Sequence, residues 1–300
     1  MIAQRSLSLA LLSALLPSLA QAAACCGGGF ALPSLIAGDD KAQISSSYSF
    51  SELAIDNVDS RGIWRKWDQH QSVQTFKIEG AHLLSDRWQA GLSVPIIRRS
   101  LTGQNYSGLG DVAASVAFEY LPDWDYNPIR PKGIGFFQLT TPTGKSKAES
   151  EVGGLDSRGN GFWAIGLGTL LSKSIRNVDG FVSLEGHRSL RKEFSNSQMN
   201  GTLNPGFGGS LGLGGGFNTR SWRFGTSITW FYEDPVSVRG NVNFDGFLER
   251  YATGVLAASY MPSDEWSGTL SYADQTLFGS PVNTSLGRTV ALQLQRRWGR

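Results

Sequence analysis

The chain has few residues of the kinds that bind metals, form disulfides or give a strong net charge. Its 300 residues include only two cysteines and three histidines. Basic and acidic residues nearly balance, at 27 and 25. This balance gives no electrostatic basis for binding nucleic acid. Two cysteines in one chain also exclude a disulfide framework of the kind that holds small secreted domains together.

Long hydrophobic runs are missing after the first 22 residues. No later segment approaches the roughly 20 apolar residues of a membrane helix. The mean hydropathy, −0.17, resembles that of a soluble protein. A membrane β-barrel gives a similar average, because its inner face is polar. The composition therefore excludes a bundle of membrane helices and leaves two classes open, a soluble β-protein and a membrane barrel.

The N-terminus has the pattern of a secretory signal peptide. Arg5 supplies the positive charge, residues 7–19 are mostly Leu and Ala, and Ala20-Gln21-Ala22 gives the small-x-small site of signal peptidase. We expect residues 1–22 to be removed after Ala22. The mature chain of about 278 residues then has 26 basic and 25 acidic residues, a net charge of +1.

The only two cysteines are adjacent, at Cys25 and Cys26, in a Gly-rich head that we place at residues 23–40. Three roles stay open. The thiols are incidental or redox-active, they capture a soft metal ion transiently, or Cys25 carries a lipid after cleavage before it. Adjacent cysteines can close only a strained ring with each other. A soft metal ion is the single cofactor that the sequence suggests.

Strict alternation of apolar and polar residues predicts β-strands along the mature chain. In residues 88–96, one face carries Trp88, Leu92 and Ile96, and the other carries Gln89 and Ser93. Residues 111–120 and 222–232 alternate in the same way. We predict about twelve strands, at residues 41–54, 70–84, 88–99, 108–121, 132–142, 160–172, 178–191, 202–218, 222–232, 250–260, 266–275 and 287–298.

The connections between these strands alternate between short turns and long polar loops. This plan is typical of an antiparallel up-and-down barrel of the bacterial outer membrane. We therefore assign residues 41–300 to an all-β transmembrane barrel. With an even number of strands, both termini would face the periplasm, where the head could hang freely or fold into the lumen as a small plug.

Tryptophans begin several of the predicted strands. The segments SDRWQAGLSV (85–94) and SDEWSGTLSY (263–272) align position by position, and TRSWRFGTSI (219–228) follows the same plan. Amphipathic rings at one height form the aromatic girdle of a membrane barrel. We assign Trp88, Trp222, Trp266 and Trp298 to this girdle. A soluble sandwich or lipocalin-like barrel would explain the alternation, but it would not explain the signal peptide or the girdle.

Two short motifs carry a resemblance to a known family. They are Gly108-Leu109-Gly110-Asp111, which opens a strand after a long loop, and Asp86-Arg87-Trp88 followed by Gly91-Leu92 and Pro95. With them, most of the mature chain resembles the outer-membrane barrel transporters of the phenol meta-cleavage pathway. The resemblance implies a channel or facilitator for small, often hydrophobic molecules, and it implies no particular substrate.

Alternation also predicts which side chains face the lumen. The candidates are Asp111, Glu119, Glu185, His187, Arg223, Gln293, Gln295 and Arg297. Mixed charges of this kind are ordinary filling of a barrel. Five glycines on one face of residues 202–218 leave space for a plug or a substrate.

An enzyme is the less favoured alternative. Some outer-membrane lipid hydrolases use a His-x-Ser pair, and this chain has His187-Arg188-Ser189. The alternation places His187 and Ser189 in the lumen, away from lipid substrates. We therefore predict no catalytic residues.

The sequence favours passive passage of a small solute across the outer membrane of a Gram-negative bacterium. The expected partners are outer-membrane lipid, the solute and the barrel-assembly machinery. The alternative is a non-conducting structural or assembly barrel, whose Cys-Cys head binds a soft metal ion or a periplasmic partner.

Overall fold

The computed structural model describes residues 32–66, 70–101, 103–123, 127, 129–147, 149–152, 154–195 and 200–300. Regular structure in these ranges consists of β-strands. The described residues include no helix long and apolar enough to cross a membrane.

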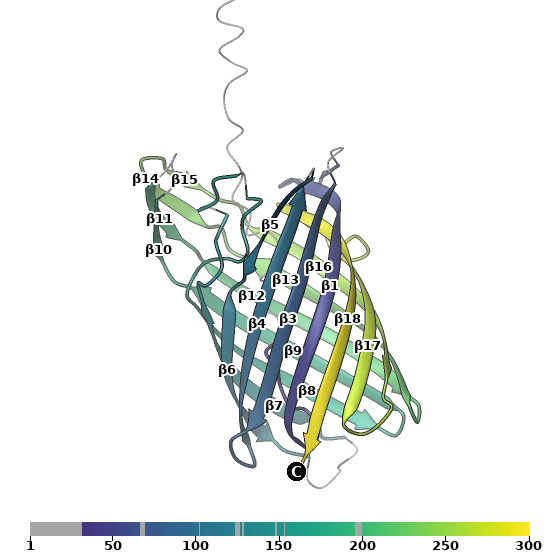
Figure 1. The fold of residues 1–300 in the computed structure, drawn as a ribbon. Helices are drawn as coiled ribbons and strands as arrows, with labels where there is room; N and C mark the ends of the chain where they lie inside the picture. Colours follow the sequence, from purple (N-terminus) through teal and green to yellow (C-terminus); the bar gives the residue numbers. More distant parts are fainter. Residues whose placement is uncertain are drawn as a thin grey trace, which may run out of the picture.

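Twelve antiparallel strands form a closed barrel (Figure 1). Each barrel strand pairs with the barrel strand that follows it in the chain. The last pairs with the first over most of its length, which leaves the barrel without a free edge. The barrel strands are β1 (Asp40–Val58), β3 (Gln71–Leu83), β4 (Trp88–Leu101), β6 (Val112–Leu121), β7 (Lys132–Thr141), β8 (Ala164–Ile175), β9 (Val178–Ser189), β12 (Phe207–Asn218), β13 (Trp222–Glu233), β16 (Glu249–Tyr260), β17 (Trp266–Asp274) and β18 (Thr284–Gly299).

The two ends of the barrel differ in their connections, as the sequence predicts. The connections at 84–87, 176–177, 219–221 and 261–265 are short, and together with the longer connection 122–131 they define what we call the turn end. The C-terminus of β18 lies at this end, at the bottom of Figure 1. The opposite end, which we call the loop end, carries the long connections at 59–70, 102–111, 142–163, 190–206, 234–248 and 275–283.

Two predicted strands are interrupted in the structure. Residues 108–121 break at Gly110-Asp111, so that β5 (Gln104–Leu109) pairs with the upper part of β4 and β6 pairs with its lower part. Residues 202–218 break at Pro205-Gly206 into β11 (Asn200–Asn204) and β12. Pro205 has no N–H to give to a ladder, which explains the second break.

A second, four-stranded sheet stands beside the barrel at the loop end (Figure 1). Its strands are β10 (Lys192–Ser195), β11, β14 (Ser237–Gly240) and β15 (Phe244–Asp245). Phe162, Phe194, Leu203 and Val238 form its buried core. The prediction of loops at 192–201 and 233–249 is therefore wrong in part. These strands are too short for alternation to distinguish them, and distant loops must meet before they pair. The remaining short strand, β2 (Trp64–Arg65), pairs with the end of β1.

The barrel wall places apolar side chains outside and polar side chains inside. Large apolar residues on every barrel strand are exposed; on β4 and β18 they include Leu92, Ile96, Leu292 and Leu294. The buried residues include polar ones such as Gln89, Ser115, Gln138 and Glu185. A soluble barrel would show the opposite distribution, because contiguous exposed apolar surface is unfavourable in water. The fold is that of an outer-membrane barrel.

Candidate functional site

Residues 32–36 of the N-terminal head lie inside the barrel. Ile36 is 2% exposed, and the side chain of Gln89 forms hydrogen bonds with both its backbone N–H and its backbone carbonyl. The N–H of Ile36 donates to Oε1 of Gln89 at 2.6 Å, and Nε2 of Gln89 donates to the carbonyl of Ile36 at 3.3 Å. This two-point contact fixes the segment against β4 near the turn end.

Two further contacts hold the same segment. Nε2 of Gln43 donates to the carbonyl of Leu35 at 3.0 Å and to Oγ of Ser34 at 3.3 Å, and Gln43 in turn accepts from Nε2 of Gln295 at 3.1 Å. Leu32 and Leu35 pack against an inner apolar cluster of Ala117, Ile134 and Phe136. Residues 32–36 thus occupy part of the lumen. Cys25 and Cys26, and with them the predicted metal or lipid site, lie outside the described residues.

A cavity of about 350 Å³ lies between this segment and the wall. Leu32, Pro33 and Ser34 form one side of it. Most of the wall residues carry hydroxyls or short side chains. They include Ser47, Ser49, Ser51, Leu53, Val73, Thr75, Lys77, Glu79, Ser93, Pro95, Asp111, Ser115, Gln138, Thr140, Tyr251, Thr284 and Thr289. Of the eight side chains predicted to line the lumen, Asp111 lines this cavity and the other seven lie elsewhere.

The ionisable groups at the cavity are already paired. Nζ of Lys77 lies 3.0 Å from Oε2 of Glu79. The carboxylate of Asp111 accepts three backbone N–H groups, from Gly144 at 2.8 Å, Asn160 at 2.7 Å and Gly161 at 3.0 Å. A negative solute would therefore find no unpaired cation among these groups, and a positive solute would have to compete with three N–H groups for the carboxylate of Asp111.

Glu185 and His187 meet on the opposite wall, together with a residue that the sequence analysis did not single out. Nδ1 of His187 lies 2.9 Å from Oε1 of Glu185, and Nε2 lies 3.0 Å from Oε1 of Glu233. The His187 side chain is only 3% exposed. Because a carboxylate faces each ring nitrogen, the imidazole is positioned as part of a charge cluster and not as a base for Ser189.

The inner glycines of β12 do not leave empty space. A Cβ on Gly208 would lie 2.3 Å from Oε2 of Glu233 and 2.4 Å from Nε2 of His187. A Cβ on Gly214 would lie 2.5 Å from the ring of Phe181. The expectation that these glycines make room for a plug or a substrate is wrong at these positions, since side chains of neighbouring strands fill the space.

The remaining predicted lumen residues lie toward the turn end. Glu119 pairs with Lys132 at 3.1 Å. Arg223 contacts both carboxylate oxygens of Asp179, at 2.6 and 2.9 Å. Gln293, Gln295 and Arg297 alternate along β18. The structure therefore places Glu119 and Arg223 in separate ion pairs and not in one site.

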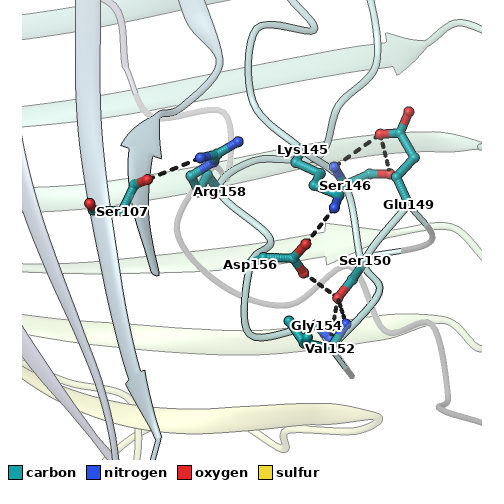
Figure 2. A network of polar contacts seen from close by, with 9 residues as sticks. All are labelled: Ser107, Lys145, Ser146, Glu149, Ser150, Val152, Gly154, Asp156 and Arg158. Atoms are coloured by element: carbon teal, nitrogen blue, oxygen red, sulfur yellow. Dashed lines mark hydrogen bonds and ion pairs between the residues drawn. The ribbon is translucent and has the colours of Figure 1, made fainter. Parts of the chain in front are cut away.

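The connection 142–163 is fastened by a polar network at the loop end (Figure 2). Asp156 accepts from Lys145 and from the hydroxyl of Ser150, and Glu149 accepts from the N–H and hydroxyl of Ser146. Arg158 donates to the carbonyl of Ser107, which ties the loop to β5. Together with the backbone contacts to Asp111, these bonds hold the loop over the start of β6.

Charge pairing shifts the acid–base behaviour of this loop. Burial opposes ionisation of Asp156, but the hydrogen bonds from Lys145 and Ser150 outweigh it, and the pKa of Asp156 is lowered. For Glu149, burial is likewise outweighed by hydrogen bonds from Lys192 and Ser146, which lower its pKa. The hydrogen bond to Asp156 raises the pKa of Lys145. The network therefore requires ionised carboxylates.

The four tryptophans of the predicted girdle project from the outer wall at the turn end. Trp88, Trp222 and Trp266 are the first residues of β4, β13 and β17, and Trp298 lies near the end of β18. Their exposed fractions are between 38% and 48%. Trp222 packs against Tyr260 with ring centroids 4.9 Å apart, and Arg296 lies over both Trp266 and Trp298.

The hydroxyl-bearing side of the lumen was not among the predicted lumen residues. Ser47, Ser49 and Ser51 alternate with the exposed residues Tyr48 and Phe50 along β1, so the segment ISSSYSFS already contained the signal. Their assembly with Thr75, Gln138 and Thr289 from other strands was not readable from spacing. In the described residues, no group of three or more His, Cys, Asp or Glu side chains could hold a metal ion.

No family model matches the chain. Its fold is similar to that of an outer membrane channel from Pseudomonas putida F1, at 14% identity and a TM-score of 0.71, covering 91% of this chain and 100% of that one. The translocator domain of the autotransporter NalP from Neisseria meningitidis matches at 10% identity and a TM-score of 0.47, covering 87% and 90% of the two chains. A mutant of the TodX monoaromatic hydrocarbon channel matches at 10% identity and 0.43, covering 86% and 89%. The likeness to the Pseudomonas protein shows a shared barrel fold.

Proposed function

We propose that this protein is a channel through which a small solute crosses the outer membrane passively, and that its N-terminal segment narrows the passage. The observation that carries the proposal is the polar lumen, which holds a cavity of about 350 Å³ beside residues 32–36. Side chains that merely filled a structural barrel would leave no such space. The shared fold with an outer membrane channel supports the same function.

The orientation follows from the general plan of outer-membrane barrels, in which short turns face the periplasm and long loops face outward. The turn end would then be periplasmic, with the tryptophans at the membrane–water interface on the periplasmic side of the outer membrane. Residues 142–163 and the small sheet would lie outside the cell. Protein and solute exchange only non-covalent contacts, so the proposed function includes no chemical step.

The resemblance to transporters of the phenol meta-cleavage pathway rests on short motifs. It keeps small hydrophobic molecules among the solutes to be tested. A hydrophobic solute would have to pass the hydroxyl-bearing wall of the cavity. The class of solute that the channel carries must therefore be determined by experiment.

The contact between Ile36 and Gln89 gives a direct test of the channel and its constriction. We expect Gln89→Leu to release the segment, because it removes both hydrogen bonds to the Ile36 peptide at nearly constant side-chain volume. Single-channel conductance in planar bilayers should rise at least twofold, and deletion of residues 23–38 should raise it further.

Gln74→Leu is the matched control for this experiment. Gln74 also lies on a barrel strand, β3, but on the same outer face as the exposed residues Phe76 and Ile78, away from the lumen and from residues 32–36. Its conductance should equal that of the unmodified mature protein. An absence of ion current in the unmodified protein, both variants and the deletion would contradict the proposed channel function. A non-conducting barrel would then be the better explanation.

A further inference from the structure

We propose that the cavity binds small uncharged solutes that carry several hydroxyl groups, of the polyol or monosaccharide kind. This inference rests on the proposed channel function and specifies its solute. It comes from the hydrogen-bonding groups of the cavity wall, from an acceptor left without a partner, and from the pairing of the local charges.

The wall offers a dense set of hydroxyls on one side of the barrel. Ser47, Ser49 and Ser51 line the cavity from β1, and Thr75 lines it from the neighbouring strand β3. Thr289 lines it from β18, where its hydroxyl lies 2.6 Å from that of Ser51. Hydroxyls both donate and accept, and they can rotate to suit a partner. Such a wall matches a solute whose own hydroxyls do the same.

Gln138 supplies the most specific feature. This residue of β7 is 4% exposed and lines the cavity, and its Oε1 has no hydrogen-bond partner among the described residues. A buried amide oxygen without a donor is unfavourable, because it has given up its contacts with water. The oxygen itself has almost no accessible surface, so the amide must first rotate toward the cavity; a hydroxyl of a bound solute would then supply the missing donor.

The charges around the cavity argue against an ionic solute. Lys77 is paired with Glu79, and Asp111 accepts three backbone N–H groups. A solute carboxylate would lose water without meeting a free cation, because Lys77 is already paired, and a solute ammonium would have to compete with three N–H groups for the carboxylate of Asp111. The lumen therefore favours uncharged solutes over charged ones of equal size.

The same groups disfavour a purely apolar solute. An apolar molecule would cover the serine and threonine hydroxyls and the Gln138 oxygen without replacing their hydrogen bonds to water. Leu53, Val73 and Pro95 also line the cavity and can contact the carbon skeleton of a solute. The cavity volume falls at the lower end of the roughly 300–1,000 Å³ that is usual for small-ligand pockets.

The test measures the block of single-channel ion current by a neutral solute. Purified mature protein in planar bilayers is titrated with arabitol, and the half-blocking concentration is compared between the unmodified protein and Gln138→Leu. We expect this concentration to rise about fivefold in the variant, the change expected for one lost hydrogen bond. Gln138→Glu, which keeps an acceptor at the same place, should retain more of the block than Gln138→Leu.

Two controls separate the outcomes. Gln74→Leu, on the outer face of β3, should be blocked by arabitol as the unmodified protein is, and arabinonate, a charged analogue with the same number of carbons, should block more weakly. Equal block of the unmodified protein and Gln138→Leu, or stronger block by arabinonate, would overturn the proposed solute class while leaving the channel intact. An absence of current from the mature and head-deleted proteins would instead remove the channel itself.

Discussion

Individual glycines on the inner face of β12 decide how densely the lumen is filled. Gly208, Gly212, Gly214 and Gly216 alternate with outward residues such as Leu211 and Leu213. Each glycine lies against a larger inner side chain of a neighbouring strand, including His187, Ser183, Phe181 and Arg223. Because these positions on β12 are glycines, the larger charged side chains of β9 and β13 have room to pack over them. The sequence predicted that these glycines leave empty space, but in the fold each is in close contact with a neighbouring side chain.

Gly208→Ala should destabilise the barrel. The added methyl group would come within 2.4 Å of Nε2 of His187 and 2.3 Å of Oε2 of Glu233, so the buried ion pair must shift. Overpacking of this kind costs about 1–3 kcal/mol. We expect a lower temperature for conversion from the compact to the unfolded form on SDS gels. Gly186→Ala, whose Cβ would have no neighbour closer than 4.0 Å, is the control and should leave that temperature unchanged.

At the scale of single elements, the connection 142–163 is held in place by side-chain charge and not by a strand ladder. Its contacts run from Asp111, at the start of β6, to the N–H groups of Gly144 and Gly161, and from Asp156 to Lys145. The carboxylates of Asp156 and Glu149 have lowered pKa values in the folded loop. A lowered folded pKa contributes stability that is present above the unfolded value and is lost as the pH falls through the folded value.

The loop should therefore open in acid. The unfolded values are 3.8 for Asp156 and 4.5 for Glu149, so the network should be intact at pH 5 and be lost as the pH falls below about 3.8. Limited digestion with pepsin between pH 5 and pH 2, followed by mass spectrometry, reports cleavage within 142–163, and an unstructured reference peptide digested alongside corrects for the pH dependence of pepsin itself. Corrected cleavage that does not increase with acidity would contradict this account.

A matched pair of variants ties the acid response to Asp156. Asp156→Asn should make the loop susceptible already at pH 5, since the amide cannot form the ion pair with Lys145. Asp264→Asn changes a carboxylate of the connection 261–265 at the turn end and should behave as the unmodified protein does.

At the scale of the whole molecule, the decisive contact joins the first and last barrel strands. β1 and β18 pair in continuous register from Ala42 and Trp298 to Leu53 and Gly287. This pairing removes both sheet edges and encloses the lumen that contains residues 32–36. Without it, the polar inner face would be open and the cavity would have no wall on the β1 side.

Closure can be tested by cross-linking. In a Cys25→Ser/Cys26→Ser background, cysteines at Tyr48 and Leu292, which are paired partners on β1 and β18, should form a disulfide on oxidation. The pair Tyr48 and Leu270 is the control, because Leu270 lies one strand further away on β17. Equal cross-linking of the two pairs in the folded protein would contradict the observed register.

Sequence analysis predicted most of the barrel because its signals are local. The twelve strands, the alternation of faces and the short and long connections all follow from a period of two between turn residues. The prediction of a twelve-stranded antiparallel barrel is confirmed. The breaks at Gly110 and Pro205 were missed, because alternation on either side continues across them.

The candidate site was less predictable because its members come from distant strands. Glu185 and His187 were chosen from their spacing, but Glu233 joins them only through the pairing of β9, β12 and β13. Gln138 gave no signal at all in the sequence. Its importance depends on burial and on the absence of a donor for Oε1 in the described residues, and both are properties of the packed lumen.

The sequence by itself determined the strands, their two faces and the exposed tryptophans at the strand ends, since each depends on neighbours in the chain. Only the tertiary structure decided that residues 32–36 lie inside the barrel, that the four-stranded sheet forms beside its mouth, and that the serines of β1 share a cavity with Gln138. Those arrangements depend on which strands pair and on what space the side chains leave. Such information is absent from any local stretch of sequence.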